Sequence, residues 1–192
     1  AIDFQNFGAV ITAGTVFAAE PARTSAFRAF ELARDAGLPI LFDVDYRPYS
    51  WPSNKIAENV LSKAAELSDA IVGNEEEFGF MSGNKENGLE KARELAKSSA
   101  ELVIYKMGEK GSITITSEKE FNTGIYRVKT LKPTGAGDSF MAGLVSSIAS
   151  GYDLKESVLR GSACTSITVS KPGCAPTMAN SKELLGFLKN NI

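Results

Sequence analysis

The sequence predicts an α/β fold in which helices pack on the faces of a mostly parallel sheet. Over the first two-thirds of the chain, short apolar runs typical of strands alternate with segments whose apolar residues recur at helical spacing. The connections between these runs are long enough for a helix, so successive strands are expected to run parallel. We therefore expect one layered α/β domain.

Four strands and their connecting helices are expected in the first 108 residues. Phe7–Gly14 has the character of a buried strand, and the segment after it carries Ala26, Phe27 and Phe30 on one helical face. Pro21 suits the first turn of that helix and Gly37 its C-terminal cap. The further expected elements are a strand at 38–46, a helix at Asn54–Ser68, a strand at 69–74, helices at Glu75–Met81 and Glu86–Ser98, and a strand at 101–108.

The pattern changes in the last third of the chain. Residues 111–118 and 119–130 alternate apolar and polar side chains, as an antiparallel pair of strands does. A glycine-rich loop follows, and the rest is helical in period, with helices expected at 137–150, 154–169 and 181–190.

Composition excludes several classes of function. The chain of 192 residues is 43% hydrophobic and 23% charged, as a globular protein is, and its net charge of −2 gives no footprint for nucleic acid. No apolar run predicts a membrane span, and two cysteines without a pairing pattern favour a reducing, cytoplasmic setting. With no histidine, chemistry has to come from carboxylates, lysine, arginine and backbone amides.

The loop TGAGD combines small residues with an acid at the start of a predicted helix. The amides of Gly135, Ala136 and Gly137 can point at an anion, and the positive end of the helix adds to that field. Asp138 in the first turn would stay ionised beside the helix dipole and could accept a hydroxyl proton. The loop is not a P-loop, because no GxxxxGK[ST] occurs. A plain turn with a helix cap remains the alternative.

Polar residues also follow the second predicted strand. Asp43, Asp45 and Arg47 are spaced by two, so in extended chain they would share one face, and Pro48 favours extended geometry at Arg47. This set is either a charge cluster or an arginine held for a phosphate.

The third and fourth strands end in residues with two readings each. Asn74 and Glu77 form a capping-box pattern, but they could also contact phosphates directly or through a hydrated Mg²⁺. Gly108 and Gly111 fit a tight hairpin, along which a nucleotide could also lie.

TGAGDSF after an antiparallel pair, with NxxE two strands earlier, resembles the ribokinase-like (PfkB) carbohydrate kinases over nearly the whole chain. The resemblance implies a three-layer α/β/α core, with ATP and Mg²⁺ bound and a small sugar or sugar acid as the partner. It makes Asp138 the catalytic base and the amides of residues 135–137 the anion hole. Asn74 would bind ATP phosphates and Glu77 would hold Mg²⁺ through water. Other ATP neighbours would be Lys106, Gly108, Gly111 and Gly173, the last in a loop near the adenine and a monovalent-cation site.

The segment DVDYRPYSW narrows the acceptor. It is similar to the branch of the family that phosphorylates 5-dehydro-2-deoxygluconate in myo-inositol catabolism, in which Arg47, with Asp45 beside it, would reach the phosphates or the acidic sugar. Kinases for 2-keto-3-deoxygluconate and fructose, which tend to have Asn at Asp45, remain alternatives. Lys132 stands where many members have an aspartate that helps bind a potassium-type ion, so we expect no monovalent-cation activation.

Members of the family also carry an N-terminal region with a small β lid and most of the sugar-binding residues. Nothing here resembles that region, so the chain is expected to correspond to the C-terminal portion, with the ATP side and the base. Alone it should phosphorylate little or no sugar. Any homodimer is expected of the full-length protein. A noncatalytic nucleotide- or sugar-binding protein on the same fold is the competing class, against which the intact Asp138 argues.

Overall fold

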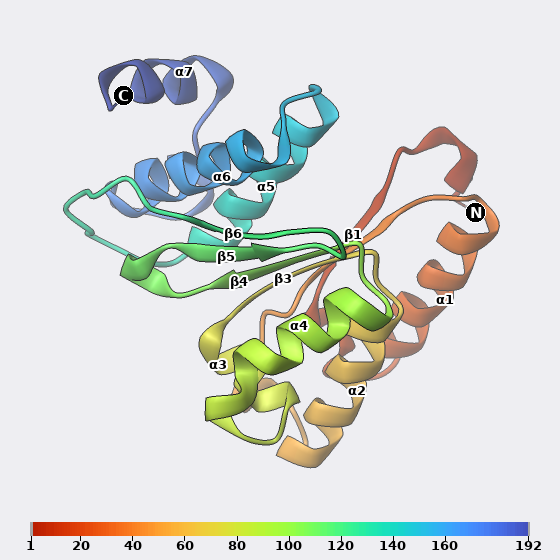
Figure 1. The fold of residues 1–192 in the computed structure, drawn as a ribbon. Helices are drawn as coiled ribbons and strands as arrows, with labels where there is room; N and C mark the ends of the chain where they lie inside the picture. Colours follow the sequence, from red (N-terminus) through yellow and green to blue (C-terminus); the bar gives the residue numbers. More distant parts are fainter. Residues whose placement is uncertain (1, 192) are drawn as a thin grey trace. The chain divides into compact units, whose positions relative to one another are not determined.

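The computed structural model describes residues 2–191, in which six strands form one sheet with the order β1-β2-β3-β4-β5-β6 (Figure 1). The strands are β1 (Val10–Ala13), β2 (Ile40–Asp43), β3 (Ala70–Asn74), β4 (Leu102–Lys106), β5 (Ser112–Ile115) and β6 (Glu120–Thr123). β1 to β4 pair in parallel, and β4 pairs with β5 in antiparallel fashion. The predicted α/β class is therefore confirmed.

Helices account for most of the remaining described chain. The α-helices are α1 (Ala22–Asp35), α2 (Asn54–Glu66), α3 (Glu75–Met81), α4 (Gly88–Ser98), α5 (Ala136–Ala149), α6 (Leu154–Val169) and α7 (Ser181–Asn190). Short 3₁₀ helices lie at Phe4–Asn6, Gly14–Phe17, Pro48–Ser50, Lys85–Asn87, Gly108–Lys110 and Ala175–Thr177. None of the helices within residues 2–191 is long and apolar enough to cross a membrane.

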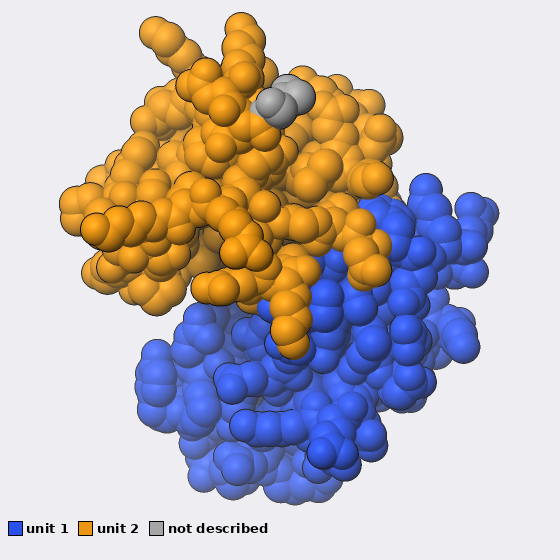
Figure 2. Space-filling view, turned by 60° about the vertical axis from the view of Figure 1, so that its left-hand side comes forward, with its two compact units in different colours: residues 1–107, 112–121 blue, residues 108–111, 122–192 orange. Residues whose placement is uncertain are grey.

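The chain folds as two compact units, which Figure 2 shows in separate colours. Unit 1 runs to Met107 and resumes over Ser112–Phe121. Unit 2 comprises Gly108–Gly111 and the chain from Asn122 onward.

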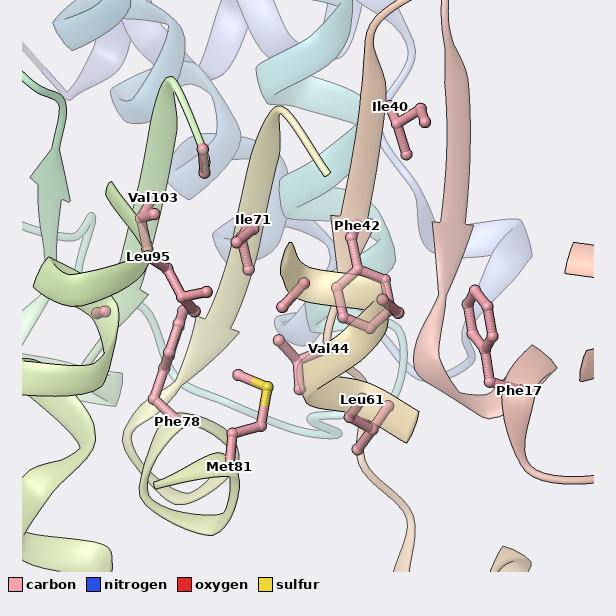
Figure 3. Packing of buried hydrophobic residues seen from close by; sticks show 14 of the residues in the cluster. Phe17, Ile40, Phe42, Val44, Leu61, Ile71, Phe78, Met81, Leu95 and Val103 are labelled. Atoms are coloured by element: carbon pink, nitrogen blue, oxygen red, sulfur yellow. The ribbon is translucent and has the colours of Figure 1, made fainter. Parts of the chain in front are cut away.

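The core of unit 1 lies between the sheet and the helices α1, α2 and α4, which cover one of its faces (Figure 1). Alternate residues of β2 and the position after it (Ile40, Phe42 and Val44) point into this core, as a pleated strand requires (Figure 3). Phe17 lies edge-on to Phe42, with 5.9 Å between ring centroids. Full burial of each such side chain contributes about 1.5–3 kcal/mol, so this cluster supplies much of the stability of unit 1.

Unit 2 is built on a close approach of α5 and α6. A Cβ on Gly143 would lie 2.9 Å from the Cα of Gly161, and a Cβ on Gly161 would lie 2.9 Å from the carbonyl oxygen of Phe140. Only glycine at both positions permits this helix spacing. Ile167 of α6 and Leu184 of α7 belong to the small core of this unit.

Two expected strands differ from those observed. The first was expected to be buried over Phe7–Gly14, but β1 is shorter and Ile11 is 49% exposed, because β1 is an edge strand. The last was expected to reach residue 130, but β6 ends at Thr123, and residues 124–130 form no regular element. Gly111, between β4 and β5, lies against the end of β6, because a Cβ there would lie 2.0 Å from the carbonyl oxygen of Thr123.

Candidate functional site

Three of the predicted site segments of unit 1 lie at the same edge of the sheet. β2, β3 and β4 are parallel, and they end at Asp43, Asn74 and Lys106. Asn74 and Lys106 are register partners on neighbouring strands. Ligands of open α/β sheets bind beyond this carboxyl edge, so these polar residues lie where a ligand of unit 1 would be expected.

Asn74 and Glu77 form the capping box at the start of α3. The Glu77 amide donates to Asn74 Oδ1 at 3.0 Å, and the Asn74 amide donates to Glu77 Oε2 at 2.8 Å. The second carboxylate oxygen, Oε1, accepts from the Tyr46 amide at 3.3 Å. Glu77 therefore holds the loop after β2 against the start of α3, and its structural role is established by these bonds.

The environment of the Glu77 carboxylate is unusual for a capping residue. Its side chain is only 6% exposed, and burial raises its pKa, with nearby Asp43 adding to the rise. The amide of Asn74 and the charge of Lys106 act in the opposite direction on the same pKa. An anionic Glu77 is thus costly here, and a cation close to it would favour its ionised form.

The donor set tests whether Mg²⁺ fits this edge. No group of three or more acidic or cysteine side chains that could hold a metal ion occurs in the part of the chain that the structure describes. A buried carboxylate whose oxygens already accept two amide bonds suits contact with a hydrated ion better than direct ligation. The residues therefore fit Mg²⁺ only as an ion that keeps waters and phosphate oxygens as its main ligands.

Asp45 and Arg47 are brought together, but not by extended chain as expected. Asp45 has a φ of +33°, which turns the backbone out of strand geometry just after β2. Arg47 is extended, as Pro48 predicts, and its Nη2 lies 2.5 Å from Asp45 Oδ1. The expectation that Asp45 and Arg47 share a strand face was wrong, because the left-handed backbone at Asp45 interrupts the extended chain. The two side chains nevertheless form an ion pair.

Sequence reasoning missed Tyr46, which lies between these two residues. Its ring stacks on Phe80 of α3 with 3.9 Å between centroids, and its hydroxyl donates to Asn54 Oδ1 at 3.2 Å. Its place in the sequence, directly between Asp45 and Arg47, was a signal that could have identified it. The stack fixes the backbone that carries Asp45 and Arg47.

In unit 2, the glycine loop enters α5 through a left-handed residue. Gly135 has a φ of +84°, and a Cβ there would lie 2.8 Å from Cys174 Sγ, so only glycine fits. The Ala136 amide donates to the Pro133 carbonyl at 3.2 Å, which differs from its expected place in an anion hole. A helix has no backbone acceptors for its first amides, so the amides of Gly137 and Asp138 remain directed at the space before α5.

Asp138 lies exposed in the first turn of α5, as predicted. That turn is anchored to α6 by two side chains: Thr165 Oγ1 donates to the Ala136 carbonyl at 3.1 Å, and the hydroxyls of Ser139 and Thr168 lie 2.7 Å apart. The carboxylate is therefore held at a fixed helix end and is open to a ligand.

The remaining predicted glycines have structural reasons for their presence. Gly108 and Gly111 both have positive φ and bracket a 3₁₀ turn in which the Gly111 amide donates to the Gly108 carbonyl at 3.1 Å. Gly173 has a φ of +138°, with space for a Cβ limited by Thr177 at 3.0 Å. Open backbone at Gly108, where a Cβ would meet nothing within 4 Å, leaves room for a ligand along this turn.

The predicted residues are divided between the two units. The group in unit 1 consists of Asp45, Arg47, Asn74, Glu77 and Lys106. The group in unit 2 consists of Gly108, Gly111, Gly135, Ala136, Gly137, Asp138 and Gly173.

Comparison with known proteins points to a single family. The chain matches the pfkB family of carbohydrate kinases over residues 2–181. It is 36% identical to a 5-dehydro-2-deoxygluconokinase of Photobacterium profundum over 186 residues, and 34% identical to a protein of the same name from Shouchella clausii over 182 residues. Each alignment covers 94% of this chain and 56% of the relative, so the chain spans about half the length of these curated relatives.

Solved structures share the fold. A fructokinase with bound ATP from Xylella fastidiosa superimposes with a TM-score of 0.87 at 18% identity, covering 97% of this chain and 63% of that one. An aminoimidazole riboside kinase from Salmonella enterica, complexed with aminoimidazole riboside and an ATP analog, gives a TM-score of 0.84 at 24% identity, covering 93% and 61%. These likenesses confirm the ribokinase-like α/β fold that the sequence predicted.

Proposed function

Because the chain belongs to the pfkB family of carbohydrate kinases, we propose that it carries the nucleotide side and the catalytic base of an ATP-dependent sugar or sugar-acid kinase. The observation that carries the proposal is Asp138, exposed in the first turn of α5 behind a glycine that must be left-handed. An acid at this place next to directed amides suits transfer of a phosphoryl group to a hydroxyl.

In the proposed reaction, Asp138 accepts the proton of the acceptor hydroxyl as its oxygen attacks the γ-phosphorus of ATP. The bond from that phosphorus to the bridging oxygen of ADP breaks, and ADP leaves with the electron pair. The amides of Gly137 and Asp138, with the positive end of α5, stabilise the negative charge of the transferring group. Mg²⁺, when bound, would neutralise charge on the phosphates, and Glu77 is the candidate in unit 1 for contact with its water shell.

We assign 5-dehydro-2-deoxygluconate as the acceptor, phosphorylated to its 6-phosphate in myo-inositol catabolism within the cytoplasm. The relatives of 34–36% identity bear this substrate in their name. A guanidinium pairs well with planar carboxylates, so Arg47 supports an acidic acceptor as well as a phosphate. Kinases of 2-keto-3-deoxygluconate or fructose are the alternatives within the family.

We further propose that the chain is the C-terminal portion of the kinase domain and requires a complementary part. β1 is an edge strand, and the exposed side chains on and beside it include Phe7, Ile11 and Val16. An unpaired edge with apolar side chains is a place where further chain can pair. The relatives are longer by enough residues to supply it.

A substrate panel tests this proposal. A polypeptide that extends this chain to the length of its relatives is given ATP, Mg²⁺ and each of 5-dehydro-2-deoxygluconate, 2-keto-3-deoxygluconate and fructose, and the phosphorylated product is measured directly. We expect the highest kcat/KM with 5-dehydro-2-deoxygluconate. Preference for another acceptor would overturn the substrate assignment, and ATP binding without transfer to any acceptor would favour a noncatalytic binding protein.

A further inference from the structure

One carboxylate joins the residues that follow β1 and β2 in unit 1. The hydroxyl of Thr15, in the 3₁₀ turn after β1, donates to Asp45 Oδ2 at 3.0 Å. The other oxygen of the same carboxylate, Oδ1, pairs with Arg47 Nη2 at 2.5 Å. Thr15 therefore holds the acid that in turn holds the arginine.

The backbone is arranged so that this contact can form. A Cβ on Gly14 would lie 2.0 Å from the carbonyl oxygen of Val44, so the end of β1 approaches the chain after β2 more closely than any other residue would allow. Asp45 is the one non-glycine residue with positive φ in residues 2–191, a conformation that costs free energy outside Gly, Asn and Asp. Strain of this kind persists where surrounding contacts hold it, and it is found often at functional sites.

Arg47 is only partly committed by its contacts with the described residues. Its Nη1 donates to the Tyr46 carbonyl at 3.1 Å, and its Nη2 pairs with Asp45. A guanidinium has five N–H donors, so three are left for a ligand. The side chain is 47% exposed, which leaves those donors accessible.

We propose that Thr15 and Asp45 are positioning residues, which hold the Arg47 guanidinium aligned for an oxyanion of the ligand. The oxyanion is a phosphate of ATP or the carboxylate of a sugar acid. This rests on the proposed function, in which Arg47 binds such a group. A long side chain that is already fixed loses less conformational freedom on binding, so alignment raises affinity. Because the acid offsets part of the arginine's attraction for an anion, what Asp45 contributes is geometry rather than charge.

Thr15→Val is the decisive variant, since it removes one hydroxyl and changes neither shape nor charge. In the polypeptide extended to the length of its relatives, affinities for ATP and for D-gluconate are measured by calorimetry. Affinity for the anion that Arg47 contacts should fall about fivefold, the size expected from loss of one ordinary hydrogen bond, and Thr15→Ser should restore it. A lower thermal midpoint with unchanged affinity for both anions would reduce Thr15 to a structural role and overturn the proposal.

Asp45→Asn provides an independent measurement, which also decides the matter if Thr15→Val fails to fold. Asparagine tolerates the same backbone and keeps one acceptor oxygen, but it carries no charge, so its contact with the guanidinium is weaker than the ion pair that it replaces. The variant leaves unit 1 more positive, so a role in charge alone predicts tighter anion binding, whereas alignment predicts weaker binding. Tighter binding would contradict the proposal.

Arg47→Ala separates this inference from the proposed function beneath it. If wild type binds neither anion, or Arg47→Ala binds both as wild type does, the proposed role of Arg47 fails. If Arg47→Ala loses affinity for one anion while Thr15→Val and Asp45→Asn keep it, the positioning inference alone is wrong.

Discussion

Glu77 combines two properties that are seldom found in one helix-capping residue. It accepts amide hydrogen bonds from both Asn74 and Tyr46, and it is buried, so that its pKa is raised. The bonds favour the ionised form, but burial has the larger effect on the pKa. The folded protein therefore binds the Glu77 proton more tightly than the unfolded chain does.

The raised pKa of Glu77 predicts that the stability of the folded protein depends on pH, and that Glu77→Gln removes this dependence. The contribution of Glu77 is fully present below its unfolded pKa near 4.5 and is lost as pH rises through the higher folded pKa. Each unit of elevation corresponds to about 1.4 kcal/mol. Urea unfolding across this range should show the free-energy difference between wild type and Glu77→Gln shrinking as pH rises. A difference that stays constant or grows would contradict the assigned sign.

At the residue scale, the sequence identified the right side chains more readily than their geometry. Asn74 and Glu77 were expected to form a capping box, and they do, because the box depends only on local spacing. Asp45 was expected in extended chain, and the positive φ was missed because it depends on Gly14 and Thr15, thirty residues away. The engagement of the Ala136 amide by Pro133 is likewise a detail of loop closure that composition does not reveal.

At the scale of elements, the predicted helices were most accurate where a side chain caps them. α3, α6 and α7 have the predicted bounds, and each is capped at its start by an Asn or Asp: Asn74, Asp153 and Asn180. Strand ends were less predictable. β1 and β6 are shorter than their apolar patterns, because strand length is set by pairing with a neighbour and not by local sequence.

The α5–α6 contact predicts opposite effects for two Gly→Ala substitutions in unit 2. At Gly161 the new Cβ would collide with the Phe140 backbone, so the free energy of unfolding should fall by about 1–3 kcal/mol. At Gly186 in α7 the Cβ meets nothing within 4 Å, and better helix propensity should raise it by about 0.5–1 kcal/mol. Urea unfolding of both variants measures this. Equal effects at both sites would show that close helix packing does not decide the result.

At the scale of the whole molecule, the sequence predicted the class of fold and the family, but not the division into two units. The alternation of strands and helices predicted a parallel sheet, and the TGAGD loop predicted the family. Both patterns are local in sequence, and the observed sheet and the family match confirm the two predictions. Gly108–Gly111, expected as a turn, belongs to unit 2, and the change of unit between Phe121 and Asn122 falls within the strand expected over 119–130. Such a division depends on contacts between distant segments, which periodicity does not record.

Asp138→Asn, made in the polypeptide extended to the length of its relatives, tests whether Asp138 is the base of phosphoryl transfer. Direct measurement of phosphorylated product should show turnover reduced by about 100-fold or more, the contribution expected of a general base, with ATP affinity retained. The matched control is Asp153→Asn, an exposed acid at the start of α6 whose capping role asparagine also fills. Near-normal turnover of Asp138→Asn, or an equal loss in the control, would show that Asp138 is not the base.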